Sequence, residues 1–328
     1  MRGRNTPPYN PKVLANNGKT NTSKWNRIHG MADKASTYPP LPLTLPSPVY
    51  DSHTHLAPGT DYKDQLDRAE AVNVIGVLQV GTDVNTSHAS VELAMQDQRI
   101  LAAVAIHPND AADIYKKAND ATHRVEGQPH TECEKCIPPA KALEKSLTQI
   151  ANLAGSKRVR AIGETGLDYF RTQSDLYRAA QRFSFDAHIQ IAKEHNLALQ
   201  IHDRDAHQDV IECLLRAGAP DRTIFHCFSG DEQMLEICIK NGWYMSCSGI
   251  ITFKNAREMQ KIFAKVPKEL LLVETDAPFL TPSPFRGFMN SSYMLAHTVR
   301  TLAEIRQENI DQLCTQLSRN TCEIFGKW

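Results

Sequence analysis

VRAIGETGLD (residues 159–168) begins with strand-forming apolar residues and ends in a polar segment that contains Glu164 and Asp168. Seven further runs have the same form: they are short and apolar, and polar or charged residues close them. Such runs are typical of buried strands, so the sequence predicts eight strands after residue 48. The other seven are PVYDSHTH (48–55), VIGVLQVG (74–81), ILAAVAIHP (100–108), LALQIHDRD (197–205), RTIFHCFSG (222–230), WYMSCSGI (243–250) and LLLVETDAP (270–278).

Segments with a helical period lie between most of these runs. Alternating strands and helices imply parallel strands joined by crossover helices. Eight such units close most naturally into an α/β fold of the (β/α)8 or TIM barrel type, with a doubly wound open sheet as the alternative. Neither GxGxxG nor GxxxxGK[ST] is present, which weakens dinucleotide-binding and P-loop readings. The helical faces hold Leu143, Leu147, Ile150 and Ala154, then Leu176, Ala180, Phe183 and Ala187, and two further helices are expected at 293–306 and 309–325.

The first 48 residues differ in composition from the rest. They are rich in Asn, Lys, Thr and Pro, and PPLPLTLPSP (39–48) is half proline. This composition favours a disordered, basic and proline-rich extension over 1–48 that ends in an extended, polyproline-like lead-in, followed by one barrel domain over 49–328. The extension could tether nucleic acid through its charge or be a plain solvated arm.

A long segment interrupts the rhythm after the third predicted strand. About thirty residues, 109–138, separate that strand from its helix, which is far more than a usual connection, so we expect an insertion there. It contains His123, His130, Cys133 and Cys136, which could form a structural zinc site. Their spacing matches no defined zinc finger, and a surface insertion with spare thiols is the alternative.

The balanced net charge conceals an asymmetry between the two ends of the chain. Residues 1–48 hold seven basic residues and one acidic residue, which leaves 30 basic and 36 acidic residues in the remainder. An acidic body argues against broad wrapping of a polyanion, so any action on nucleic acid would need bound cations. No apolar run is long enough to span a membrane. The eight scattered cysteines do not resemble a disulfide framework, and we expect a cytoplasmic protein.

Ionisable residues fall at the ends of five predicted strands. In a (β/α)8 barrel these ends converge on one mouth, where active sites lie. Residues i and i+2 of a strand point the same way, so His53 and His55 can face one ion. Each residue alone has an ordinary structural explanation, but the joint placement predicts a pair of divalent cations, which suits hydrolysis of phosphodiesters. The predicted ligands are His53, His55, Glu164, His202, His226 and Asp276.

The blocks DSHTHL (51–56), IHP (106–108), GETGLDY (163–169), IHDRDA (201–206), HCFSG (226–230) and ETDAPFL (274–280) resemble, in order, the motifs of the TatD-like deoxyribonuclease family. That family lies in the metal-dependent amidohydrolase superfamily. The resemblance covers roughly residues 48–326. It implies a TIM barrel, two divalent metal ions (Mg, Mn or Zn) and hydrolysis of DNA by metal-activated water, often as a 3′-to-5′ exonuclease.

The resemblance also implies individual roles. His53, His55 and Asp276 look like ligands of one metal, Glu164 like a carboxylate bridging both, and His202 and His226 like ligands of the second. Asp276 also occupies the position of the family's general base, so Asp276 and Glu164 are the expected catalytic residues. The residues expected to contact substrate are His107, Arg204 and Arg286, with structural roles as their alternative.

Two departures from the family pattern concern substrate choice more than metal chemistry. The segment after Arg286 and Gly287 reads Phe288, Met289, Asn290, without the usual acidic residue that follows. Asp203 stands where a small hydroxyl residue is common. The alternatives to a deoxyribonuclease are a metal-dependent ester or amide hydrolase, such as a D-aminoacyl-tRNA deacylase, and a non-catalytic binding barrel. We expect a monomer or a weak oligomer.

Overall fold

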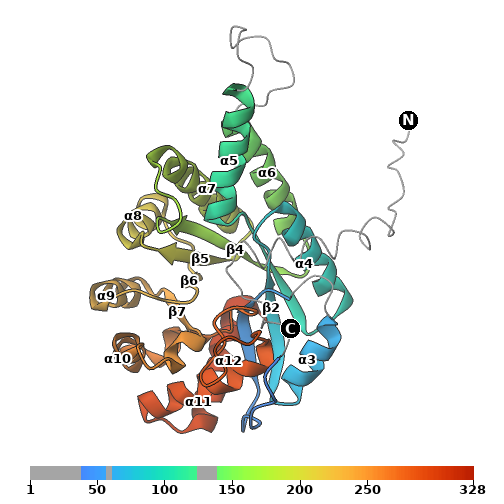
Figure 1. Cartoon of the computed structure of the whole chain (residues 1–328), viewed down its shortest axis with the longest axis vertical. Coiled ribbons are helices and arrows are strands. Elements are labelled where there is room, and N and C mark those ends of the chain that lie inside the picture. The colour runs from blue at the N-terminus through green and yellow to red at the C-terminus, as the bar shows by residue number, and fades with distance from the viewer. Residues whose placement is uncertain (1–37, 57–60, 124–138) are drawn as a thin grey trace.

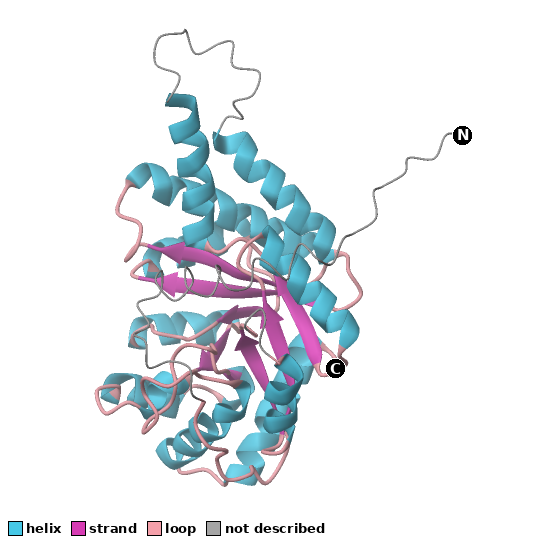
Figure 2. Ribbon diagram, turned by 45° about the vertical axis from the view of Figure 1, so that its right-hand side comes forward, coloured by secondary structure: helices cyan, strands magenta, loops and turns pink. Residues whose placement is uncertain are grey.

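Eight parallel strands form one sheet in sequential order, and helices surround it (Figures 1 and 2). The computed structural model describes residues 38–56, 61–123 and 139–328. The edge strands meet where the His55 N–H donates to the Ala277 carbonyl and the Asp276 N–H to the His53 carbonyl, so the barrel is nearly closed. The strands are β1 (Val49–Thr54), β2 (Val74–Val80), β3 (Ile100–Val104), β4 (Val159–Asp168), β5 (Ala198–Arg204), β6 (Thr223–Phe225), β7 (Tyr244–Cys247) and β8 (Leu271–Val273). The predicted (β/α)8 barrel is confirmed.

The helices form a layer outside the strands (Figure 2). Their apolar stripes pack on the outer face of the sheet, as with the buried Leu143, Leu147 and Ile150 of α6. The α-helices are α3 (Tyr62–Glu70), α4 (Val84–Gln96), α5 (Pro108–His123), α6 (Pro139–Ala154), α7 (Asp175–Glu194), α8 (His207–Ala217), α9 (Glu232–Asn241), α10 (Arg257–Lys265), α11 (Leu295–Arg306) and α12 (Ile310–Phe325). In the ranges that the structure describes, three short 3₁₀ helices lie at η1 (Gly249–Thr252), η2 (Lys268–Leu270) and η3 (Ser292–Met294).

A second, smaller apolar cluster fills the barrel interior below the site. Polar side chains lie above it: Ser52 Oγ is 3.1 Å from Ser246 Oγ, and Gln200 Nε2 donates to the Ser52 carbonyl at 2.8 Å. This packed interior makes the barrel a platform that holds the strand ends in fixed positions. The cluster consists of Leu78, Val80, Leu101, Ala103, Ala161, Ala198, Ile224, Leu272, Ile324 and Phe325.

The boundary predicted at residue 48 is wrong for residues 38–48, which are ordered against the barrel. Leu45 is buried, its N–H donates to the Val72 carbonyl, and Asn73 Nδ2 donates to the Leu45 carbonyl. The Tyr293 hydroxyl donates to the Pro39 carbonyl at 2.6 Å. Proline enrichment indicated an extended backbone correctly, but these carbonyls find donors on the barrel. Residues 1–37 of the predicted disordered extension lie outside the described residues.

The segment after β3 also differs from its prediction. Helix α5 begins at Pro108, directly after the strand, so the first half of the 109–138 insertion is helical. Its helical period was missed: Ala111 and Ala112 are buried, and Ile114 and Tyr115 pack on the core. Helix α5 packs against α6, and the two extend from the barrel side by side (Figure 1). Of the proposed zinc ligands, the side chain of His123 and all of His130, Cys133 and Cys136 lie outside the described residues.

Candidate metal centre

Glu164 of β4 lies at the centre of the gathered side chains. Its Oε1 is 2.6 Å from Nδ1 of His202 and 2.9 Å from Nε2 of His226. Its Oε2 is 3.6 Å from Nε2 of both His53 and His55. One carboxylate therefore contacts imidazoles from three other parts of the barrel, β1, β5 and the segment after β6.

Asp276 approaches the same centre from the segment after β8. Its Oδ1 lies 3.7 Å from Nε2 of His53 and 3.6 Å from Nε2 of His55. Its backbone adopts the left-handed region at φ 52°, a costly conformation for a residue other than glycine. The bond from its N–H to the His53 carbonyl, 2.9 Å long, holds this conformation and ties the carboxylate to β1.

The donor set fits divalent cations. Atoms that bind one cation at about 2.0–2.2 Å lie roughly 3–4 Å from one another, the range of the carboxylate–imidazole distances given above. Nε2 of His53 and Nε2 of His55 are only 3.1 Å apart, which is unfavourable for two protonated rings. Within the described part of the chain, three residue groups have ligand atoms within 4.8 Å of one another: His53, His226 and Asp276; His53, His55 and Glu164; His107, Glu164 and His202.

His107 belongs to this cluster as well; the sequence predicted it as a substrate contact, with a structural role as the alternative. Its Nε2 lies 3.5 Å from Oε1 of Glu164, and its ring packs edge-on against His202 at 4.5 Å between centroids. Its other nitrogen, Nδ1, accepts the Asn109 N–H at 3.1 Å in the first turn of α5. This hydrogen bond fixes the ring with Nε2 facing Glu164.

Groups on the far side of each ring from the centre, here called outer partners, orient the imidazoles through Nδ1. Nδ1 of His55 is 2.9 Å from the Val80 carbonyl, and Nδ1 of His53 is 3.0 Å from Oε1 of Gln200. Nδ1 of His226 lies 3.2 Å from Oε1 of the fully buried Glu274. Each contact leaves Nε2 directed at the centre, which is the arrangement found around metal-binding histidines.

Sequence reasoning missed these partners. Their spacing from the predicted ligands could have indicated them, since Gln200 precedes His202 by two residues and Glu274 precedes Asp276 by two. Along a strand this spacing places Gln200 on the same face as His202, one layer deeper in the barrel. Asp168 was missed too: its Oδ2 lies 3.4 Å from Nε2 of His202 and accepts from Asn109 Nδ2 at 3.0 Å.

Burial and close charges shift the pKa values of these groups strongly. Burial lowers the pKa of His53 to about 4, and the charge of His226 acts in the same direction. Burial would raise the pKa of Glu164, but His226 and His107 outweigh it and hold that pKa well below its usual value. Burial raises the pKa of Asp276 to about 7, against the opposing charges of His226 and His55. Bound cations would favour ionised carboxylates and neutral imidazoles here.

The two arginines expected to contact substrate both lie on aromatic rings. The Arg204 guanidinium sits 4.0 Å from the ring centroid of Phe170, and that of Arg286 sits 4.3 Å from the ring of Phe253. Neither forms an ion pair with a carboxylate of the described residues. Their contact with substrate stays a prediction.

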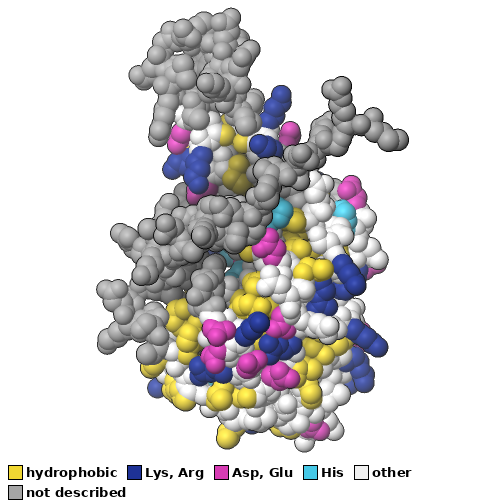
Figure 3. Space-filling model, turned by 90° about the vertical axis from the view of Figure 1, so that its right-hand side faces the viewer, with side chains coloured by type: hydrophobic (Ala, Val, Ile, Leu, Met, Phe, Trp, Pro, Cys, Tyr) yellow, Lys and Arg dark blue, Asp and Glu magenta, His cyan; other side chains and the backbone are white. Residues whose placement is uncertain are grey.

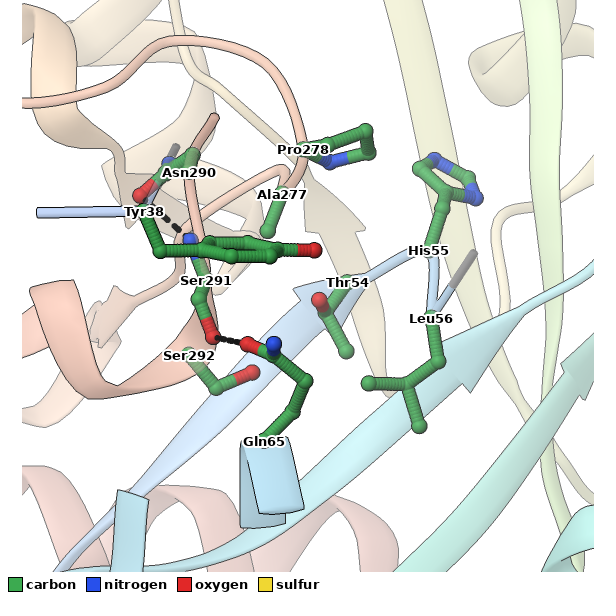
Figure 4. A pocket seen from close by; sticks show the side chains of 10 residues that line it. All are labelled: Tyr38, Thr54, His55, Leu56, Gln65, Ala277, Pro278, Asn290, Ser291 and Ser292. Atoms are coloured by element: carbon green, nitrogen blue, oxygen red, sulfur yellow. Dashed lines mark hydrogen bonds between the residues drawn. The ribbon is translucent and has the colours of Figure 1, made fainter. Parts of the chain in front are cut away.

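The ordered N-terminal lead-in forms one wall of a small cavity of about 20 Å³ beside His55. Figure 4 shows the Tyr38 ring lying across this cavity, with its hydroxyl directed toward the side that Thr54 and His55 occupy. The opposite wall includes Gln65, which accepts a hydrogen bond from the Ser291 hydroxyl. The Thr54 hydroxyl is buried without a hydrogen-bond partner among the described residues. Residue 38 thus borders the candidate centre.

A barrel whose mouth gathers five imidazoles and two carboxylates in clusters suited to metal ions defines a metal-dependent hydrolase. The sequence profile described as TatD related DNase matches residues 50–326. The chain belongs to the TatD-related DNase family, as its motifs predicted.

Individual relatives agree with this assignment. The chain is 35% identical over 286 residues to the uncharacterized metal-dependent hydrolase TatD of Mycobacterium tuberculosis, covering 85% of this chain and 98% of that protein. It is 32% identical to the uncharacterized metal-dependent hydrolase YabD of Bacillus subtilis, over 84% of this chain and 98% of the relative.

Solved structures share the barrel. The crystal structure of YjjV, a TatD homologue from Escherichia coli K12, superposes with a TM-score of 0.70 at 26% identity, covering 84% of this chain and 97% of that one. A TatD-family hydrolase from Entamoeba histolytica superposes with a TM-score of 0.66 over 87% of this chain and 99% of that one. At 17% identity the second likeness concerns the fold alone.

Proposed function

We propose that this protein hydrolyses phosphodiester bonds of DNA at a centre of two divalent metal ions. The observation that carries the proposal is the position of Glu164, whose two carboxylate oxygens face different imidazoles. Oε2 faces His53 and His55, while Oε1 faces His202 and His226. A carboxylate so placed can serve two cations at once.

The residues divide between the two ions as follows in this proposal. His53, His55 and Asp276 would hold the first, and His202 and His226 would hold the second, with Glu164 shared. Because His107 Nε2 lies 3.5 Å from Glu164 Oε1, it offers the second ion a further nitrogen or contacts the substrate phosphate. Mg, Mn and Zn are the candidate metals, since nitrogen-rich donor sets accept Zn and Mn while phosphodiester hydrolysis commonly uses Mg.

When bound, such cations lower the pKa of a coordinated water and offset the negative charge that develops on the phosphodiester. The protein supplies the remaining parts. Asp276 borders the centre at the barrel mouth, where its carboxylate can orient the attacking water and accept its proton. Glu274 and Gln200, through His226 and His53, keep the imidazoles aimed inward.

The surface charge supports binding of the substrate by a few cations near the centre rather than by a broad basic surface. On the face shown in Figure 3, basic and acidic side chains are intermingled. Arg204 and Arg286, each without a carboxylate partner among the described residues, are the cations we assign to substrate phosphates. The family description supports DNA as the polyanion. Six cysteines of the described part are free thiols, which supports our expectation of a cytoplasmic enzyme.

The decisive assay incubates the purified protein with DNA labelled at either end, in Mg²⁺, Mn²⁺ or Zn²⁺ and with an EDTA control. We expect metal-dependent release of single nucleotides from the 3′ end, as for a 3′-to-5′ exonuclease. Glu164→Ala should abolish turnover while circular dichroism shows an unchanged fold. D-aminoacyl-tRNA is assayed in parallel: loss of its ester with DNA left intact would replace this proposal by a deacylase. Full activity of Glu164→Ala would refute the shared carboxylate.

A further inference from the structure

The loop that follows β4 presents an aromatic side chain to solvent beside the candidate centre. Phe170 is 54% exposed, so it contributes little to the core. Its ring lies 4.0 Å from the Arg204 guanidinium carbon, at the end of the neighbouring strand β5. An exposed ring backed by a cation is the pairing found where proteins stack nucleobases.

The backbone of this loop is held firmly although the ring is free. The Tyr169 N–H donates to the Arg204 carbonyl at 2.9 Å, and the Arg171 N–H donates to Asp168 Oδ1 at 2.8 Å. Gln173 Nε2 donates to the Phe170 carbonyl at 3.0 Å. A ring presented from a fixed backbone loses little conformational entropy when it binds a partner, because its position is already set.

Strand β5 places the Phe170–Arg204 pair next to the metal cluster, on the solvent side. Gln200, His202 and Arg204 alternate along the strand and therefore share one face. Exposure increases along this row: Gln200 is buried, His202 is intermediate and Arg204 is exposed. At about 3.3 Å per residue, Arg204 lies roughly 7 Å further toward solvent than His202. A strand whose phosphate reaches His202 would pass next over Arg204.

We propose that Phe170 and Arg204 form a stacking platform for an unpaired nucleobase of the substrate strand. Phe170 supplies the aromatic face, and Arg204 backs that ring and contacts the adjoining phosphate. The neighbouring Asp203 forms no ion pair with Arg204 among the described residues, and its Oδ2 lies 2.7 Å from His207 Nδ1. This inference rests on the proposed function, and it adds that bases outside a duplex stack are preferred next to the cleaved bond.

Equilibrium binding tests the platform without turnover. Fluorescence anisotropy of a labelled phosphorothioate oligo-dT, which resists hydrolysis, measured in Mn²⁺, should show that Phe170→Ala weakens binding about 5- to 150-fold, the loss expected for one stacked base. Phe170→Trp should retain binding, whereas Phe170→Leu, apolar but without a π face, should not. Phe183→Ala is the matched control, because Phe183 is similarly exposed, at 44%, on helix α7 among apolar neighbours.

An abasic oligonucleotide separates stacking from other effects of the substitution. Placing one abasic nucleotide in turn at each of the terminal positions should reveal one position at which wild type and Phe170→Ala bind equally. Equal binding of both proteins to intact oligo-dT, or wild-type binding by Phe170→Leu, would overturn the platform. DNA hydrolysis by the wild-type protein separates the platform from the proposed function. If wild type cleaves DNA while the binding results contradict the platform, only the platform is wrong. If wild type cleaves no DNA, the proposed function is wrong.

Discussion

Nε2 of His53 and Nε2 of His55 face each other at 3.1 Å, two residues apart where β1 ends. Protons on both atoms would repel, and a shared proton or a cation relieves the contact. His53 is fully buried, and burial lowers its pKa to about 4, so it resists protonation. Both rings are fixed from behind by Gln200 and by the Val80 carbonyl, and neither can turn away without losing a hydrogen bond.

Removing one ring of this pair should therefore abolish binding of the first ion. We expect His55→Ala to weaken Mn²⁺ or Zn²⁺ binding by more than the about 10- to 100-fold that loss of an outer partner costs. Isothermal titration and metal content after dialysis measure the change. His88→Ala, at an exposed position on α4, should bind like wild type. Undiminished metal stoichiometry and affinity in His55→Ala would contradict the assignment.

Gln200 should matter through His53 rather than through the substrate. Gln200→Leu removes the partner of His53 Nδ1 and the donor to the Ser52 carbonyl. We expect metal affinity to fall about 10- to 100-fold, with kcat falling in parallel at limiting metal. Saturating metal should restore most of kcat, which a direct catalytic role would not allow. Gln208→Leu, on the exposed side of α8, serves as the control.

Much of the fold was predictable because strand ends carry a strong local signal. Buried apolar runs that end in His, Glu or Asp predict where parallel strands terminate, and sequential parallel order follows from the intervening helices. The gathering of Glu164 with His53 and His226 followed from that topology. The outer partners did not follow so directly: Gln200 and Glu274 precede the expected ligands by one strand period, and only the closed barrel shows that they contact other strands.

The two errors of the prediction share a physical cause. The proline-rich residues 39–48 predict an extended backbone within a disordered extension, but an extended segment is ordered when the barrel offers donors, as Asn73 and Tyr293 do. In α5, the helical spacing of Ala111, Ile114 and Tyr115 was masked by Asn, Asp and Lys around it. In both segments the local composition predicted no ordered structure, but contacts with the rest of the protein order them.

The ordered lead-in should contribute measurably to stability. Leu45 is 1% exposed, so Leu45→Ala should lower the free energy of unfolding by about 2–5 kcal/mol through lost burial and the cavity left behind. Leu43 lies two residues earlier and is 78% exposed, and Leu43→Ala should change stability by less than about 0.5 kcal/mol. Urea denaturation followed by circular dichroism measures both. Equal values for the two variants would mean that the lead-in is not docked in solution.

A buried histidine outside the metal cluster should make stability depend on pH. His188 accepts the Ile106 N–H at Nε2, 3.0 Å away, and Nδ1 lies 2.7 Å from the Ser184 carbonyl. The ring must therefore be neutral, and burial lowers its pKa from 6.5 to about 4. Between these values the unfolded chain binds the proton and the folded chain does not. The stability due to this group is thus complete above about pH 6.5 and is lost as the pH falls toward 4.

The expected size of this effect is about 3 kcal/mol, from about 1.4 kcal/mol for each pH unit between the two pKa values. His188→Gln keeps an acceptor for Ile106 but cannot take up a proton. Unfolding in urea at pH 4.5, 5.5 and 7 should show wild type losing more stability with acid than His188→Gln. His195→Gln, at an exposed position, should retain the wild-type slope. Parallel pH profiles for wild type and His188→Gln would show that another group controls the acid sensitivity.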